Sequence, residues 1–232
     1  MERTIIITQD GSHTINIPLL NVTYHSIHGA VQESKHVFIE AGLKASGRFH
    51  QRDALTQPGA LNIFEAGFGT GLNALLTLME STDNNIPVHY SALELYPLHK
   101  QEYQSLNYCE SLHAPSLQPV FEQLHQCDWE KEIYISPQFT LNKSNQSLLN
   151  FTTGKRFDLV YFDAFAPAAQ PELWTKKVFE KLYEMMSDHA ILVTYCSKGD
   201  VRRAMQSAGF RIEKLKGPPG KREMIRAVKI GY

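Results

Sequence analysis

The chain has 232 residues, of which 43% are hydrophobic and 20% charged, and its formal net charge is −1. This length and balance predict one α/β domain with a small appendage, and they exclude an extended tail or scaffold. No apolar run reaches the roughly eighteen residues of a membrane span and the start lacks a signal-peptide pattern, so we expect a cytoplasmic protein.

The cysteine and histidine patterns give no sign of a structural metal. Cys109, Cys127 and Cys196 are odd in number and far apart, which argues against a disulfide framework and a zinc ribbon. None of the ten histidines forms an H-E-x-x-H motif. We therefore expect no metal.

The first fifty residues predict an addition to the main fold. Residues 4–8 and 13–17 are rich in isoleucine and threonine and flank Asp10-Gly11, a strong hairpin signal. A helix-like segment follows near Val37 and Phe38. We assign residues 1–50 to an N-terminal hairpin and cover segment, and residues 51–232 to the main domain.

A glycine-rich turn follows the first strand of that domain. Leu61 to Phe64 reads as a buried strand, the glycines come at alternate positions, and helical spacing begins at Leu72. Glycines let the backbone come close to a ligand, and the helix N-terminus offers unpaired N–H groups. The turn therefore predicts a ligand site, although such a turn need not bind anything.

The glycine spacing favours S-adenosylmethionine over a dinucleotide. The dinucleotide pattern G-x-G-x-x-G would require glycine where Leu72 stands, so NAD is the lesser alternative. The pattern resembles motif I of class I S-adenosylmethionine methyltransferases. Glu94 ends the next strand and could accept the ribose hydroxyls, unless it only caps the strand. The predicted cofactor residues here are Glu65, Gly67, Gly69, Thr70, Gly71, Asn73 and Glu94.

A third acid ends a strand in the second half of the chain. Residues 111–145 give weak signals, with paired strands possible at 133–135 and 139–141. By contrast, Phe157 to Asp163 is a clear buried strand. Since ligands lie beyond the carboxyl ends of strands in open α/β sheets, Glu65, Glu94 and Asp163 should point into one crevice.

The remaining elements complete the predicted fold. A helix from Pro171, a strand at 190–195, a helix at 199–208 and an antiparallel pair at 209–215 and 224–230 follow in order. They predict a mostly parallel seven-stranded sheet with one reversed strand and helices on both faces. Together with the resemblance of the glycine turn to motif I, this implies a class I (Rossmann-like) methyltransferase fold.

The C-terminal part is basic. From Lys198 to Tyr232 there are ten basic residues and three acidic ones. This bias predicts a phosphate-binding face, with a solvated face as the alternative. The four residues that we expect to bind phosphates are Arg202, Arg203, Lys221 and Arg222.

Several motifs together resemble one family. They are residues 65–73, Leu93-Glu94-Leu95-Tyr96-Pro97, Asp163-Ala164-Phe165-Ala166-Pro167 followed by Pro171-Glu172-Leu173-Trp174, and Lys221-Arg222-Glu223-Met224. In this order they are similar to the methyltransferase domains of the MnmC family, bacterial tRNA 5-methylaminomethyl-2-thiouridine biosynthesis proteins whose stand-alone form is called MnmD.

The resemblance implies a reaction. Such domains transfer a methyl group from S-adenosylmethionine to the aminomethyl group of the tRNA wobble uridine, and bifunctional members also carry an FAD-dependent oxidase domain. Because we find no second nucleotide motif, we expect only the methylation, without FAD, on tRNA prepared by other enzymes.

Two positions depart from the family pattern. Relatives carry Gly-Asp where Ser144-Asn145 stand, which makes Asn145 the expected adenine contact. They carry Lys-Asn where Ala169-Gln170 stand, which removes a charge near the substrate entrance.

The expected catalytic residue is Asp163, which would accept a hydrogen bond from the amine and orient its lone pair; a turn-capping role is the alternative. Tyr24, Phe165 and Pro167 are expected near the uridine, although a core or lid role suits Tyr24 equally. Two other functions stay open: a methyltransferase or aminopropyltransferase for small amines, and a non-catalytic binding protein.

Overall fold

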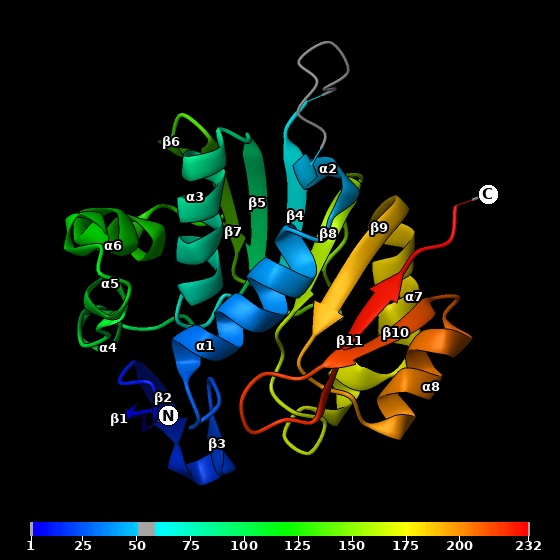
Figure 1. Ribbon diagram of the computed structural model, residues 1–232, viewed down its shortest axis with the longest axis horizontal. Coiled ribbons are helices and arrows are strands. Elements are labelled where there is room, and N and C mark those ends of the chain that lie inside the picture. Colours follow the sequence, from blue (N-terminus) through cyan, green and yellow to red (C-terminus); the bar gives the residue numbers. More distant parts are fainter. Residues whose placement is uncertain (1, 51–58, 232) are drawn as a thin grey trace.

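The computed structural model describes residues 2–50 and 59–231, which contain a small and a large sheet (Figure 1). The small antiparallel sheet consists of β1 (Thr4–Ile7), β2 (His13–Ile17) and β3 (Val22–Thr23). Its β1–β2 pair, from Thr4 opposite Asn16 to Ile7 opposite His13, confirms the predicted hairpin. The domain boundary after residue 50 stays a prediction, because residues 51–58 lie outside the described ranges.

The large sheet has the order β10-β11-β9-β8-β4-β5-β7-β6 in the part of the chain that the structure describes. Its strands are β4 (Leu61–Ala66), β5 (Val88–Leu93), β6 (Glu132–Ser136), β7 (Phe139–Ser144), β8 (Phe157–Phe162), β9 (Met186–Thr194), β10 (Arg211–Lys216) and β11 (Glu223–Val228). The pairs within β7-β5-β4-β8-β9 are parallel, so their carboxyl ends meet at one edge. This edge positions the functional site.

The strand count differs from the prediction. Within residues 59–231 the sheet has eight strands rather than seven, and both β11 and β6 run against their neighbours. The strand missing from that count is β6, an edge strand that forms a hairpin with β7, as residues 133–135 and 139–141 suggested. Its residues are half-buried or exposed, and its apolar run of Ile133, Tyr134 and Ile135 is too short to mark it clearly in the sequence.

Helices cover both faces of the large sheet (Figure 1). They are α1 (Ala30–Ser34), η2 (Lys35–Leu43), α2 (Gly47–His50), α3 (Leu72–Asn84), α4 (Lys100–Gln104), α5 (Tyr108–Ser111), α6 (Gln118–Gln126), α7 (Lys176–Met185) and α8 (Gly199–Ser207), with short turns at η1 (Pro18–Leu20), η3 (Pro115–Leu117) and η4 (Pro171–Trp174). No helix in the described ranges is long and apolar enough to cross a membrane.

Alternate residues of the central strands supply two hydrophobic cores. Ile63 and Tyr161 point to the face covered by η2, α3 and α6, whereas Phe64 and Phe162 point to the face covered by α7 and α8. This alternation explains why the central strands read as continuous apolar runs: both of their faces are buried.

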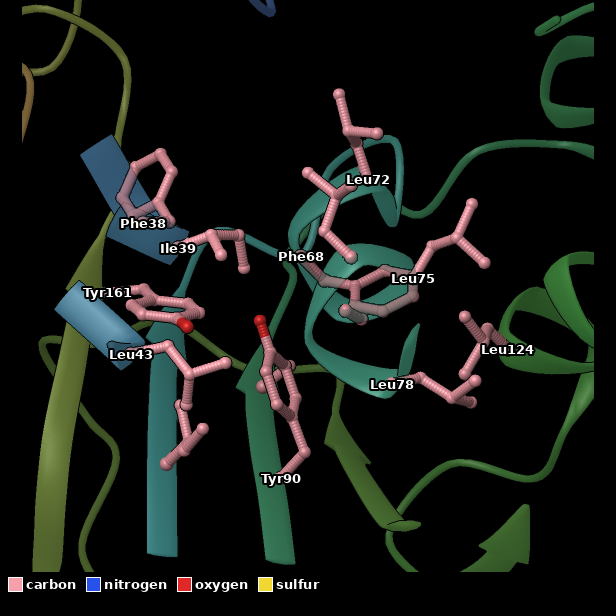
Figure 2. Packing of buried hydrophobic residues seen from close by; sticks show 14 of the residues in the cluster. Phe38, Ile39, Leu43, Phe68, Leu72, Leu75, Leu78, Tyr90, Leu124 and Tyr161 are labelled. Carbon is pink, nitrogen blue, oxygen red and sulfur yellow. The ribbon is translucent and has the colours of Figure 1, made fainter. Parts of the chain in front are cut away.

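The predicted cover segment packs into the first of these cores. Figure 2 shows side chains of η2 and α3 gathered over Tyr90 and Tyr161 of the sheet. The Phe38 ring, which is 1% exposed, lies 5.2 Å from the Tyr161 ring between centroids. The segment from α1 through η2 is therefore one of the helical layers on the sheet.

Candidate functional site

A cavity of about 590 Å³ opens at the carboxyl ends of the parallel strands. Its wall brings together residues from the glycine turn, β5, the loop after β8, the N-terminal sheet and the β10–β11 turn. Nine of the predicted site residues line it: Tyr24, Gly67, Gly69, Thr70, Asn73, Glu94, Asp163, Phe165 and Lys221. Figure 1 shows the small sheet beside this edge of the large sheet.

The glycine turn packs too tightly for side chains. Gly67 has a φ of +98°, and a methyl group there would lie 2.7 Å from the carbonyl oxygen of Asp163. Gly69 has a φ of +51°, and a methyl group there would lie 3.0 Å from the Tyr24 ring. The glycines therefore bring the turn into direct contact with the predicted catalytic and substrate residues.

Glu94 is bound to the same turn. One carboxylate oxygen accepts the Gly69 N–H at 2.9 Å, and the other accepts the Tyr96 N–H at 2.8 Å. A carboxylate has about four lone-pair positions, so each oxygen can still accept a hydroxyl group. Glu94 is half-exposed and lines the cavity, which fits a role as acceptor for a ribose diol.

Asn73 connects two carboxyl groups below the turn. Its amide nitrogen lies 2.9 Å from a Glu65 oxygen and 2.9 Å from an Asp163 oxygen. Glu65 is fully buried and its pKa is raised well above the usual value, mainly by desolvation. Glu65 therefore lies beneath the cavity wall and positions Asn73, which differs from the expected contact with the cofactor.

Asp163 is the titratable group best placed for proton chemistry. Its pKa is raised to about 7: burial is the largest cause, the nearby Glu33 carboxylate adds to it, and Asn73 and Lys221 act in the opposite direction. A carboxyl group with this pKa exchanges protons near neutral pH.

Two histidines bind Thr70 in the turn. The His25 ring lies 3.4 Å from the Thr70 hydroxyl, and the His125 ring lies 3.0 Å from the Thr70 carbonyl oxygen. Burial lowers the pKa of His25 to about 4 and that of His125 to about 3. Both rings are therefore neutral at neutral pH, and His125 donates its Nε2 proton to Thr70.

An aromatic pair lies between the turn and the loop after β8. The Tyr24 and Phe165 rings meet edge to face with centroids 5.1 Å apart. Phe165 is positioned through its backbone, because its N–H donates to the Gln170 side chain and its carbonyl accepts from the Trp174 indole. Trp174 packs in the hydrophobic core and, through this hydrogen bond, also shapes the wall.

The other predicted residues lie outside the cavity lining. Asn145 donates from its amide to the carbonyl oxygens of Glu94 and Leu95, whereas Gln146, Ser147 and Leu148 line the wall nearby. Gly71 precedes α3, with a φ of +73°. Pro167, Arg202, Arg203 and Arg222 are likewise absent from the lining within the described ranges. Their roles stay predictions.

Sequence reasoning missed residues that reach the cavity from distant segments. They include Arg3, His25, Glu33 and Tyr195. No local motif marks them, because they meet only after folding. The Lys221–Glu33 ion pair, for example, joins residues 188 positions apart.

The cavity fits S-adenosylmethionine. Its volume lies in the range of about 300–1,000 Å³ that is usual for small-molecule sites. Its wall combines a glycine turn before a helix with a carboxylate at the next strand end, as nucleoside cofactors require. Gly67, Gly69 and Glu94 would hold the cofactor.

Comparisons with known proteins support this assignment. Residues 119–230 match a family model described as S-adenosyl-L-methionine-dependent methyltransferase. Over 96% of its length the chain is 30% identical to the tRNA 5-methylaminomethyl-2-thiouridine biosynthesis bifunctional protein MnmC of Burkholderia multivorans. The protein of that name from Ectopseudomonas mendocina is 32% identical over 87% of the chain. The chain is related to MnmC. It spans about a third of the length of these relatives, 34% and 31% respectively.

A solved structure confirms the predicted fold. The crystal structure of MNMC2 from Aquifex aeolicus matches 97% of this chain, and 69% of that chain, with a TM-score of 0.77 at 23% identity. This match confirms the predicted class I methyltransferase fold. The predicted relationships, to S-adenosylmethionine-dependent methyltransferases and to MnmC, are confirmed by the family model and the MnmC relatives. The substrate is a separate question.

We predict that Glu94→Ala weakens S-adenosylmethionine binding by about 10-fold or more, because it removes acceptors for both the ribose and the turn. Glu94→Gln should bind with intermediate affinity, since it keeps one acceptor oxygen. Calorimetry on both variants measures this, with the exposed Asp128→Ala as control. Unchanged affinity in Glu94→Ala, or tighter binding of NADH by the wild type, would contradict the prediction.

We also predict that acid weakens the fold through His25 and His125. Their folded pKa values of about 4 and about 3 lie below the unfolded value of 6.5, so the unfolded state binds more protons below about pH 6.5. The free energy of unfolding should therefore fall as pH falls from about 6.5 to about 4. Urea unfolding across this range should show a shallower pH dependence for His125→Gln than for the wild type. Equal pH dependence of the free energy of unfolding in the variant and the wild type would contradict this prediction.

Proposed function

We propose that the chain transfers a methyl group from S-adenosylmethionine to the aminomethyl group of 5-aminomethyl-(2-thio)uridine at the tRNA wobble position. The observation that carries the proposal is the position of Asp163, whose backbone touches Gly67 of the cofactor turn and whose side chain lines the cavity. A hydrogen-bond acceptor at this place can contact the substrate amine close to the methyl donor. The names of the MnmC relatives support the choice of tRNA.

The chain's own residues would align the amine and accept its proton. When bound, S-adenosylmethionine supplies a methyl group already activated on a sulfonium, so no covalent enzyme intermediate is needed. One Asp163 oxygen accepts from Asn73, which leaves the carboxylate oriented and able to accept an amine N–H. This contact directs the nitrogen lone pair and can supply several kcal/mol through positioning.

The aromatic pair offers a place for the flipped base. Unstacked bases of single-stranded RNA loops commonly stack on aromatic side chains. Tyr24 contacts Gly69 of the turn, and Phe165 follows Asp163 by two positions, so a base beside this pair would present its substituent near Asp163. Methylation without an accompanying FAD-dependent step stays a prediction.

The direct test is methyl transfer to tRNA that carries 5-aminomethyl-2-thiouridine, followed by mass spectrometry of its nucleosides. We expect 5-methylaminomethyl-2-thiouridine as the product. Asp163→Ala should lower kcat by about 100-fold or more and leave cofactor affinity nearly unchanged. In the wild type, kcat should rise with pH through about 7, because the carboxylate is the active form.

Spermidine serves as the competing substrate in this assay. Faster methylation of spermidine than of the tRNA would replace the proposal with a small-amine enzyme. Wild-type turnover in Asp163→Ala would move the acceptor role to another residue.

The tRNA backbone should lie across Arg202, Arg203 and Arg222. Arg202 and Arg203 are in α8, which follows the carboxyl end of β9, and the exposed Arg222 is in the β10–β11 turn at the same edge. Lys221 of the predicted group instead points into the cavity and pairs with Glu33.

Replacing these three arginines with alanine should weaken binding of different tRNAs alike, because phosphate contacts carry no sequence information. The slope of log K against log salt should become shallower by up to about three units. Filter binding at low and moderate salt measures it, with the exposed pair Lys176→Ala/Lys177→Ala on α7 as control. An unchanged slope in a folded triple variant would exclude this surface.

A further inference from the structure

The β10–β11 turn and the N-terminal segment meet over Asp163. The Lys216 carbonyl lies 2.7 Å from the His36 ring, and a methyl group at Gly220 would collide with the His28 ring. Next in the chain, the Lys221 ammonium pairs with Glu33 of α1. These contacts between the two ends of the chain fix where the Lys221 side chain enters the cavity.

Lys221 has donor capacity left. Its ammonium donates to Glu33 and lies 3.8 Å from the centroid of the Tyr195 ring. An ammonium group has three N–H donors. Within residues 2–50 and 59–231, this ammonium makes one hydrogen bond, to Glu33. Its other N–H donors are therefore available on a side chain that lines the cavity.

Glu33 makes this ammonium a fixed feature of the wall. Its carboxylate is almost fully buried, and its second oxygen accepts the Ser26 N–H at 2.7 Å. A buried carboxylate requires a cationic partner, since an unpaired charge in the interior is costly. Lys221 is therefore held in place beside Glu33 at the cavity wall rather than moving freely at the surface.

Asp163 thus offers a hydrogen-bond acceptor, and Lys221 offers a hydrogen-bond donor, on the wall of the same cavity. A 5-aminomethylpyrimidine-dione offers the complementary pair, because its amine N–H is next to the carbonyl oxygen on ring carbon 4. A simple aliphatic amine has no such carbonyl. Arg3, the other Lys or Arg side chain lining the cavity among the described residues, already donates to Tyr96 O, Pro97 O and Glu102.

We propose that Lys221 donates a hydrogen bond to the 4-carbonyl oxygen of the acceptor pyrimidine and thereby selects an aminomethylpyrimidine over a simple amine. This inference rests on the proposed function and adds a specificity-determining contact to it. Its positive charge also disfavours a cationic acceptor at the same place, and methyl transfer requires the neutral amine.

The test compares two acceptor nucleosides, 5-aminomethyluridine and its analogue with hydrogen in place of the 4-oxygen, in methyl-transfer assays with the full chain. The wild type should favour the first by about 10-fold or more in kcat/KM, as expected when a charged donor loses its acceptor. In Lys221→Met this preference should disappear. Lys221 also lowers the pKa of Asp163, so the assays are run well above pH 7, where the Asp163 carboxyl ionises in both forms and the loss should appear mainly in KM.

Matched variants separate this contact from a structural role. Lys216→Met removes an exposed ammonium just before the same turn and should keep the wild-type preference. The double variant Glu33→Gln/Lys221→Met leaves no unpaired buried carboxylate, and its S-adenosylhomocysteine affinity and melting temperature report on the fold. It should also lack the preference.

The outcomes distinguish this inference from the proposed function. If the wild type methylates 5-aminomethyluridine but treats both nucleosides alike, or if folded Lys221→Met keeps the preference, the Lys221 contact is wrong and the proposed function stands. If the wild type methylates neither nucleoside nor the modified tRNA, the proposed function fails first.

Discussion

The side-chain amide of Asn73 donates to both Glu65 and Asp163, and the site depends on this shared donor. Two carboxyl groups this close in the interior favour protonation of at least one of them. Glu65 is fully buried, and desolvation raises its pKa well above the usual value, which favours its neutral form. Asp163, at the cavity wall, can then ionise near neutral pH.

The hydrogen bond from Asn73 to Asp163 also links the glycine turn to the predicted catalytic residue. Asn73 lies in the first turn of α3, directly after the glycines, while Asp163 follows β8. Gly67 meets the Asp163 backbone closely enough to exclude any side chain. Under the proposed function, one junction between adjacent strands would position both the methyl donor and the proton acceptor, which suits a reaction whose barrier is lowered mainly by alignment.

The sequence predicted the features that local patterns encode, and it missed those that depend on contacts between distant residues. The turn, its helix and the strand before Asp163 are continuous local patterns, and the structure has them as predicted. The predicted count of seven strands omitted β6, because this half-exposed edge strand has no long apolar run. Glu65 was assigned to the cofactor because its place before the turn is visible in sequence, whereas its complete burial depends on packing from both faces. Lys221 was grouped with basic neighbours, since only the fold pairs it with Glu33.

The two ends of the chain build the cavity wall around Asp163. Tyr24 and Glu33 come from the N-terminal segment and Lys221 from the last hairpin, so residues far apart in the sequence share this wall. The core elements supply what any methyltransferase of this fold needs, a turn and a carboxylate for the cofactor. The added segments supply an aromatic pair and a fixed lysine, which under the proposed function would discriminate among methyl acceptors. The reaction class would then reside in the sheet, and the substrate choice in the segments that close over its edge.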